Sequence, residues 1–244
     1  MAPERSPIPQ GLAGAVNPSP TPVTPRPAST VLLIDAAVAP WRLLMMRRPG
    51  GADFAPGAYV FPGGSVHADD AMLGDADRVA AVRELFEEVG VLLARRRDGR
   101  FARDRECGGL RSLLAAGATF GSALDSLGLS LALDRLVFLA RWITPEAVRR
   151  RFDTRFYLAR RPPGQTVHPQ EGEVADWLWI APAEALAEGG PTLVHATRRI
   201  LESVAGEPDA RRLIARRRRR SETPPVTPVV VPRPGGGFDI LDGA

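Results

Sequence analysis

The stretch Ala80-Ala81-Val82-Arg83-Glu84-Leu85-Phe86-Glu87-Glu88-Val89-Gly90-Val91 separates into two faces when it is read as a helix. Apolar side chains recur at i, i+3, i+4 and i+7 on one face, and Glu84, Glu87 and Glu88 lie on the other. Glu84 and Glu88 repel each other at i,i+4 unless a cation lies between them. A hard divalent ion with oxygen ligands would supply that positive charge, and a solvated acidic face is the alternative. Gly90 is placed to end the helix.

The segments on either side of this helix are typical of a mixed α+β domain. Strands are predicted at 30–35, 41–48, 59–61, 136–142, 155–159 and 177–180. Further helices are predicted over 110–128 and from residues 182 and 191. Residues 65–77 and 95–109 are polar and are expected to form loops. We therefore expect an α+β sandwich, with a mixed sheet between helices, rather than a doubly wound sheet.

The two ends of the chain differ in composition from its middle. Residues 1–28 are rich in proline without periodicity, and we expect a disordered leader. Residues 29–205 form the predicted domain. Residues 206–244 carry an arginine-rich segment and a terminal strand pair around the glycines 235–237. The seven arginines between 211 and 220 indicate a solvated helix face or tail, with nucleic-acid or anionic-surface binding as the alternative.

Composition limits the class of protein. Apolar residues make up 44% of the 244, enough for a core, and no apolar run is long enough for a membrane span or a signal peptide. All 32 basic residues are arginine, which indicates coding bias in a high-GC, bacterial genome. The net charge of +4 is too modest to predict nucleic-acid binding. The single cysteine, Cys107, excludes an internal disulfide and favours a reducing, cytoplasmic compartment.

The segment Pro62-Gly63-Gly64, a following loop and the stretch Arg83-Glu84-Leu85-Phe86-Glu87-Glu88-Val89-Gly90-Val91 together resemble the Nudix box. The family pattern is a glycine, five residues, a glutamate, seven residues, and then Arg-Glu-apolar-any-Glu-Glu-any-Gly-apolar. Its second half matches this chain at every fixed position. A match of this kind is far more specific than a lone glycine motif, and it favours the metal site over the solvated acidic face.

The first half of the box departs from the family pattern. With five residues between it and Gly64, the family glutamate would stand at Asp70, an aspartate here, and twelve residues separate Asp70 from Arg83. With seven residues between it and Arg83, the glutamate would stand at Asp75 instead. Asp69, Asp70 and Asp75 therefore all remain open as the acid of the first half.

The resemblance implies a Nudix fold and the metal-dependent hydrolysis of a diphosphate linked to another moiety, with Mg²⁺ or Mn²⁺ as the cofactor. The implied metal ligands are the carboxylates of Glu84, Glu87 and Glu88 and the carbonyl of Gly64. Arg83 lies one residue before Glu84 and four before Glu87, so we expect it to pair with and orient a ligand carboxylate.

A general base is expected from Glu84, from Glu87 or from a loop elsewhere in the chain. Nudix enzymes often place an additional acidic ligand or base on a loop in the region that corresponds here to residues 168–173. Glu173 is the first candidate in this loop and Glu171 the second. Plain solvation on an exposed loop is the alternative for both.

Two further segments are similar to the coenzyme A-cleaving branch of the family. These are the apolar strand that ends at Arg48, followed by 54–64, and the stretches 142–145 and 150–157. The stretches 142–145 and 150–157 resemble a bacterial and eukaryotic subgroup near the peroxisomal coenzyme A diphosphatases. That subgroup carries a long loop inside the box and a helical insertion after it, here at 65–77 and about 95–130. The expected phosphate contacts, each with a surface salt bridge as the alternative, are Arg47, Arg48, Arg151 and Arg155.

The leading substrate is therefore coenzyme A or an acyl derivative. The alternatives are dinucleotides or nucleotide sugars, or a non-catalytic Nudix domain that binds a nucleotide and regulates a partner. We expect a small-molecule diphosphate substrate, without a membrane or nucleic-acid partner. A homodimer remains an open alternative.

Overall fold

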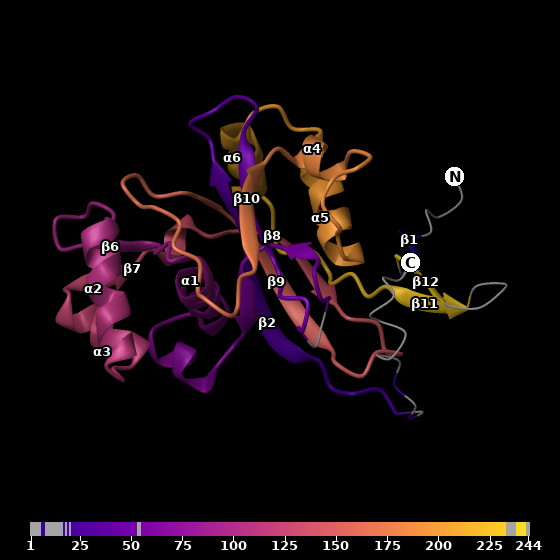
Figure 1. The fold of residues 1–244 in the computed structure, drawn as a ribbon, viewed down its shortest axis with the longest axis horizontal. Coiled ribbons are helices and arrows are strands. Elements are labelled where there is room, and N and C mark those ends of the chain that lie inside the picture. The colour runs from indigo at the N-terminus through magenta and orange to yellow at the C-terminus, as the bar shows by residue number, and fades with distance from the viewer. Residues whose placement is uncertain are drawn as a thin grey trace.

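A computed structural model of the protein describes residues 6–7, 17, 19, 21–52, 55–232 and 238–242. Its centre is a seven-stranded sheet (Figure 1). The main strands, in spatial order, are β10 (Asp176–Ile180), β3 (Arg42–Arg47), β2 (Arg26–Asp35), β9 (Phe152–Arg160) and β8 (Val137–Ile143). β4 (Tyr59–Val60) pairs with β3, and β5 (Gly63–Ser65) pairs with β2. The sheet is mixed, because β2 and β9 are parallel and the other pairs are antiparallel.

The helices come in two groups. The first contains the 3₁₀ helix η2 (Ala68–Met72), α1 (Ala76–Val89), α2 (Asp104–Ala115) and α3 (Phe120–Ser126). The short strands β6 (Ala94–Arg96) and β7 (Leu129–Leu131) pair with each other beside α2 and α3, and η3 (Leu133–Arg135) leads into β8. The second group contains α4 (Pro182–Leu186), α5 (His195–Ala205) and α6 (Ala210–Arg218).

Alternating side chains of the central strands enter two separate hydrophobic clusters. In β2, Val31 and Leu33 join the cluster that contains α1, whereas Leu32 and Ile34 join the cluster that contains α4, α5 and α6. Side chains of a strand point to opposite faces in turn, so both faces of the sheet are buried. The predicted α+β architecture, a mixed sheet between helices, is confirmed.

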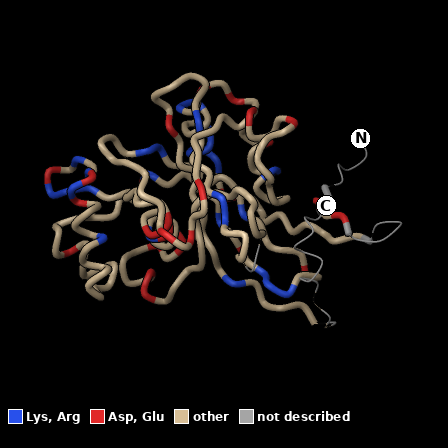
Figure 2. The backbone as a smooth tube through the Cα atoms, in the orientation of Figure 1, with Lys and Arg blue, Asp and Glu red and all other residues tan. Residues whose placement is uncertain are grey.

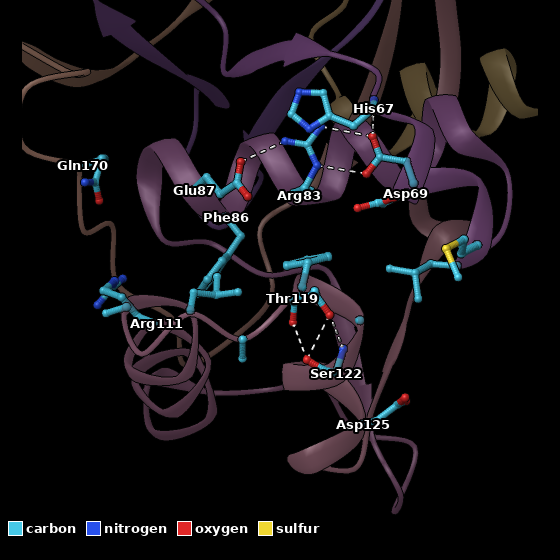
Figure 3. A pocket seen from close by; sticks show the side chains of 18 of the residues that line it. His67, Asp69, Arg83, Phe86, Glu87, Arg111, Thr119, Ser122, Asp125 and Gln170 are labelled. Carbon is cyan, nitrogen blue, oxygen red and sulfur yellow. Dashed lines mark hydrogen bonds and ion pairs between the residues drawn. The ribbon is translucent and has the colours of Figure 1, made fainter.

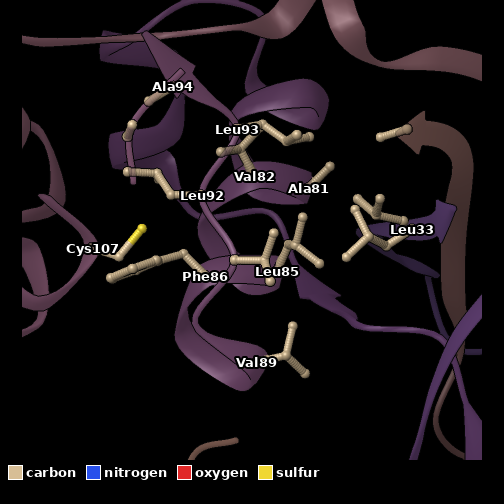
Figure 4. Packing of buried hydrophobic residues seen from close by; sticks show 14 of the residues in the cluster. Leu33, Ala81, Val82, Leu85, Phe86, Val89, Leu92, Leu93, Ala94 and Cys107 are labelled. Carbon is tan, nitrogen blue, oxygen red and sulfur yellow. The ribbon is translucent and has the colours of Figure 1, made fainter. Parts of the chain in front are cut away.

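The apolar face of α1 packs against the sheet (Figure 4). Val82, Leu85 and Val89 are fully buried, and Phe86 is 2% exposed. Their spacing predicted this face, and its burial against β2 side chains such as Leu33 fixes the rotation of the helix. The acidic residues of α1 are thereby turned toward the loop that precedes it.

The insertion after α1 is helical, as expected, but it contains two helices where the sequence predicted one helical segment. α2 ends at Ala115, and Gly117 then adopts a left-handed conformation with φ of 90°. The hydroxyl of Thr119 accepts a hydrogen bond from the Ser122 amide at 3.2 Å and so caps a new helix, α3. The left-handed turn at Gly117 and the cap at Thr119 therefore divide the predicted helical segment into two helices.

The helix predicted from residue 191 begins instead at His195. The Tyr59 amide donates to the Thr192 carbonyl at 2.8 Å, and Tyr59 forms a parallel bridge with Leu193. This pairing with β4 holds 192–193 extended, so the helix starts two residues after the bridge.

Both ends of the described chain contribute strands. β11 (Val229–Pro232) and β12 (Phe238–Leu241) pair antiparallel, which confirms the terminal strand pair, and β1 (Ser6–Pro7) adds to the far edge of β12. The glycines 235–237 lie outside the described residues, as does most of the predicted leader. The leader boundary at residue 28 falls inside β2. In the part of the chain that the structure describes, no helix has the length and hydrophobicity needed to cross a bilayer.

Candidate active site

Helix α1 positions the acidic residues, and its two ends are fixed by local chemistry. At its start the carboxylate of Asp75 accepts a hydrogen bond from the Arg78 amide at 3.1 Å. At its end Gly90 has a φ of 72°, and its amide donates to the Phe86 carbonyl at 2.8 Å. Acidic residues gather beside this helix (Figure 2).

Arg83 is the centre of the site, and all five of its N–H donors are used. Its Nε and Nη2 donate to the two carboxylate oxygens of Asp70 at 2.9 and 3.1 Å. Nη1 donates to Glu84 at 2.8 Å and to Glu87 at 2.9 Å, and Nη2 also donates to the Ser65 carbonyl at 2.8 Å. Arg83 is only 6% exposed. The expected pairing with ligand carboxylates is confirmed, and one guanidinium joins the helix to the preceding loop.

The same contacts distinguish the three aspartates of the long loop. Asp70 is 2% exposed and receives Arg83 from one side and the His67 amide, at 2.8 Å, from the other. Asp69 is exposed, and Asp75 caps α1. Asp70 is thus the acid that faces the second half of the box, and the 3₁₀ helix η2 absorbs the extra loop length.

The carboxylate of Glu84 lies against the backbone of Gly64. A Cβ atom at position 64 would approach that carboxylate to 2.5 Å, so only glycine lets the two segments come this close. Burial raises the pKa of Glu84 above its ordinary value, and Arg83 opposes that shift. The expected Gly64 ligand therefore lies beside the expected Glu84 ligand.

Glu88 lies deeper than Glu84, at 8% exposed. Its carboxylate accepts a hydrogen bond from the Gly63 amide at 2.8 Å. Burial raises the pKa of Glu88 well above its ordinary value, the Gly63 hydrogen bond opposes the shift, and the neighbouring Glu84 adds to it. A cation between the carboxylates of Glu84 and Glu88 would offset both the cost of their burial and their mutual repulsion.

The donor atoms that these residues offer are of the kind that binds a divalent cation. They are hard oxygen donors, two of them on buried carboxylates that repel each other, beside a close-packed glycine backbone. Within the described ranges, however, no three acidic, histidine or cysteine side chains are grouped so as to hold a metal ion. Glu84 and Glu87 are instead turned toward Arg83.

The loop that carries the candidate bases closes over the end of α1. The amides of His168 and Gln170 donate to the last helical carbonyls, those of Val89 and Glu88, at 2.9 and 2.8 Å. Glu173 then lies along the same cavity as Glu87. Glu171 is exposed and lines neither of the two cavities that border the site.

Two cavities border the site, and different carboxylates line each of them. The larger, about 980 Å³, lies between α1 and the insertion (Figure 3), and Asp70, Arg83 and Glu87 line it. The smaller, about 430 Å³, lies over the sheet, and Glu84, Glu88 and the glycine pair line it. A diphosphate at the carboxylates would have room for a different group on each side.

The four arginines predicted to contact phosphate lie in different settings. Arg48 lines the smaller cavity, and Arg47 lies 3.9 Å from Asp176. Arg155 donates to Asp77 at 2.9 Å. Arg151 is 7% exposed and donates to two backbone carbonyls, those of residues 144 and 23, at 3.0 and 2.8 Å. The structure brings only Arg48 to a cavity beside the carboxylates.

Sequence reasoning missed two further arginines at these cavities. Arg150 lines the smaller cavity, and its place beside Arg151 in the run 149–151 was a signal, since neighbouring side chains point in different directions. Arg111, on α2, lines the larger cavity with its guanidinium carbon 5.9 Å from the ring centre of Phe86. Nothing in the local sequence of α2 indicates that contact.

Comparison with protein families identifies the same region of the chain. The NUDT19 Nudix domain family matches residues 73–189, and the NUDIX domain family matches residues 24–109. These two ranges overlap across α1 and together span the sheet and the insertion.

The chain is also similar in sequence to individual Nudix proteins. The putative nudix hydrolase 7 of Caenorhabditis elegans is 36% identical over 163 residues, which cover 67% of this chain and 54% of that protein. The human acyl-coenzyme A diphosphatase NUDT19 is 28% identical, with 59% of this chain and 54% of that protein covered. The chicken protein of that name is 30% identical, with 66% and 62% covered. The chain thus spans only 54–62% of the length of these curated relatives.

Among solved structures, a NUDIX hydrolase from Alicyclobacillus acidocaldarius superposes with a TM-score of 0.68. Its sequence identity to this chain is 27%, and the superposition covers 79% of this chain and 96% of that one. The likeness therefore extends over nearly the whole of that hydrolase.

Proposed function

The chain belongs to the Nudix hydrolase family, and from that premise we propose that it hydrolyses the diphosphate linkage of a nucleoside-diphosphate derivative with Mg²⁺ or Mn²⁺. Coenzyme A or an acyl-coenzyme A is the leading substrate. The observation that carries the proposal is the five-donor contact of Arg83, which orients Glu84 and Glu87 and joins them to Asp70, with Glu84 against Gly64. A domain that only bound nucleotides would have no need for that set of acids.

The residues that would hold the metal are Glu84, Glu87 and Glu88, with the carbonyl of Gly64. When bound, the ion would neutralise charge on the diphosphate and lower the pKa of the attacking water. Arg83 keeps the carboxylates oriented through the hydrogen bonds described above. Asp70 holds Arg83 in turn.

Glu173 is the proposed general base, with Glu87, across the same cavity, and Glu84 as alternatives. The base takes a proton from water while the water oxygen forms a bond to one phosphorus. The bond between that phosphorus and the bridging oxygen breaks, and the second phosphate leaves with that oxygen. Glu171 stays the second candidate on the loop.

The substrate proposal has two supports. The human and chicken relatives are named acyl-coenzyme A diphosphatases, although this chain covers only part of each. Arg48 and Arg150 line the smaller cavity, where their planar guanidinium groups suit the phosphates of a nucleotide. We keep Arg47, Arg151 and Arg155 as weaker proposals for substrate contact, because their described partners are protein groups.

The test is a substrate panel with Mg²⁺ and with Mn²⁺. The panel contains coenzyme A, an acyl-coenzyme A, a dinucleotide and a nucleotide sugar, each assayed with wild type, Glu87→Gln and Glu188→Gln, a change of an exposed glutamate outside both cavities. We expect Glu87→Gln to lower kcat at least about 100-fold, on the scale of a lost catalytic electrostatic contact, and the control Glu188→Gln to change it less than twofold. Product is measured as newly formed phosphomonoester.

The outcomes separate the alternatives. If wild type and Glu87→Gln release product equally from every compound, the metal-site proposal is wrong. If wild type cleaves nucleotide sugars but leaves coenzyme A compounds intact, only the substrate proposal is lost. If wild type binds nucleotides without cleaving any of them, the non-catalytic regulator is favoured. A cytoplasmic setting remains a proposal that rests on the single cysteine, Cys107, which is buried and free.

A further inference from the structure

The larger cavity, which we call the insertion chamber, is continuous with the catalytic carboxylates. Arg83 and Glu87 of α1 form part of one wall, and the end of α2 and the start of α3 form the opposite wall (Figure 3). Gln170 and Glu173 border it from the loop over the end of α1. A substrate whose diphosphate lies at the carboxylates can therefore extend one of its two halves into the insertion chamber.

Part of the insertion chamber's surface is apolar. Its apolar lining residues include Leu73, Phe86, Leu114, Ala118 and Phe120. Phe86 and Phe120 are in ring contact, with their centres 6.4 Å apart. At about 980 Å³ the chamber has the volume of a site for a drug-sized molecule. A flexible chain with an apolar end would bury its surface here.

The charges around the chamber disfavour the nucleotide half of the substrate. Asp69, Asp125 and Glu173 add three carboxylates to Glu87 and Asp70 at its edge. Arg83 also lines it, but every donor of that guanidinium is already used. Five carboxylates thus face two arginines in the chamber, the second being Arg111, whereas Arg48 and Arg150 balance two glutamates in the smaller cavity. Additional phosphate groups would therefore meet more repulsion in the chamber. Charge thus distinguishes the two cavities.

Arg111 adds a polar feature to the apolar wall. Its guanidinium stacks toward the ring of Phe86, and its Nη2 atom is buried without a hydrogen-bond partner among the residues that the structure describes. The donor lies beside Gly90, where a Cβ atom would approach it to 2.5 Å. Because this atom has almost no exposed surface and Gly90 does not line the chamber, this donor is not open to a ligand in the chamber.

We propose that the insertion chamber binds the non-nucleotide half of the substrate, an uncharged amide-containing chain with an apolar acyl end. The nucleotide half then lies in the smaller cavity, which Glu84 and Glu88 border. This assignment rests on the proposed function. It gives the insertion a role in specificity, since α2 and α3 supply the chamber wall that faces α1.

The experiment fills the chamber with a side chain. Ala115 and Ala116 are adjacent, exposed residues at the end of α2, but only Ala115 lines the chamber. We expect Ala115→Trp to lower kcat/KM for octanoyl-coenzyme A at least tenfold and that for free coenzyme A by a smaller factor. Ala116→Trp, the matched control, should leave both values within twofold of wild type. Equal losses on both substrates, or no loss on either, would overturn the proposal.

Binding of octanoyl-pantetheine, the acyl chain without its nucleotide, separates this proposal from the proposed function. In calorimetry without metal, wild type and Ala116→Trp should bind it, and Ala115→Trp should bind it at least fivefold more weakly. If wild type does not bind it, the chamber assignment is wrong even when acyl-coenzyme A is hydrolysed. If wild type binds it but cleaves no diphosphate, the chamber assignment stands and the proposed function fails.

Discussion

Two arginine–carboxylate clusters join distant parts of this chain, and they differ in burial. The first centres on Arg83, whose side chain is 7% exposed and contacts Asp70 and two glutamates of α1. The second centres on Arg199, whose side chain is 34% exposed and pairs with Asp242 and Glu202. Asp242 follows β12, so the second cluster ties the end of the described chain to α5.

The difference between the two clusters shows how burial changes the contribution of an ion pair to the free energy of unfolding. Water can replace a lost partner in the half-exposed Arg199 cluster, so the pairing contributes little to the free energy of unfolding. In the Arg83 cluster the carboxylates of Asp70 and Glu84 have little access to water, so removing the guanidinium leaves charges that cannot be solvated. We therefore expect the first cluster to control both stability and activity, and the second to control neither strongly.

The largest effect is expected when the two arginines are replaced. Arg83→Met should lower the free energy of unfolding by about 3–5 kcal/mol, because it leaves a buried charge unpaired. Arg199→Met should lower it by at most about 1 kcal/mol, because its side chain is about a third exposed. Urea unfolding of both metal-free variants beside wild type measures the two values. Similar losses in the two variants would contradict the role given to burial.

A smaller effect is expected within the first cluster. Asp70→Ala removes the acceptor of Arg83 Nε and of the His67 amide and should lower the free energy of unfolding by about 1–3 kcal/mol. Asp69→Ala changes an exposed neighbour and should stay within about 0.5 kcal/mol of wild type. Thermal and urea unfolding give both values. A larger loss from Asp69→Ala than from Asp70→Ala would contradict the choice of Asp70 as the acid in the first half of the Nudix box.

The smallest expected effect is a difference between Glu88 and Asp242 in how each makes the free energy of unfolding depend on pH. Burial raises the pKa of Glu88 well above 4.5, so between the two pKa values the native state binds more protons than the unfolded state. Stability from this group therefore falls as pH rises through that window. Burial also raises the pKa of Asp242, but hydrogen bonds from His195 and Arg199 outweigh it and hold the pKa below 3.8. The stability that Asp242 contributes is therefore lost as pH falls through that lower pKa.

Urea unfolding in EDTA from pH 3 to pH 8 measures this difference. Glu88→Gln should reduce the decline of stability on the alkaline side and leave the acid side as in wild type. Asp242→Asn should reduce the decline on the acid side alone. The two assignments fail if each variant changes the opposite side of the profile.

The sequence alone was sufficient to predict those helices and strands whose apolar pattern and end caps lie in the same segment. The helix predicted in the stretch 80–91 is found at Ala76–Val89, because its apolar periodicity lies within the helix and its caps, Asp75 and Gly90, directly flank it. The central strands were found for the same reason, since their apolar residues pack on both faces of the sheet. The pairing of Arg83 with Glu87 also follows from spacing along one helix.

Contacts between separate segments could not be predicted in this way. Asp70 reaches Arg83 only because η2 shortens the path of the long loop, and counting residues leaves Asp75 equally eligible. Arg151 matched the expectation for a phosphate contact, but its guanidinium donates to backbone carbonyls of two other segments. Arg111 reaches the site from a helix whose own sequence carries no metal or phosphate motif.

The arrangement of β2 has a consequence for the order in which the site can form during synthesis on the ribosome. Its residues Ala28 to Thr30 pair with β5 on one side and with Thr154 to Phe156 of β9 on the other. The glycine pair and α1 emerge from the ribosome well before β9, and chains emerge at about 5–20 residues per second. Until β9 arrives, the edge of β2 that lies opposite the strand with Gly63 and Gly64 stays open. The segments that carry the proposed metal ligands are therefore synthesised early but supported late.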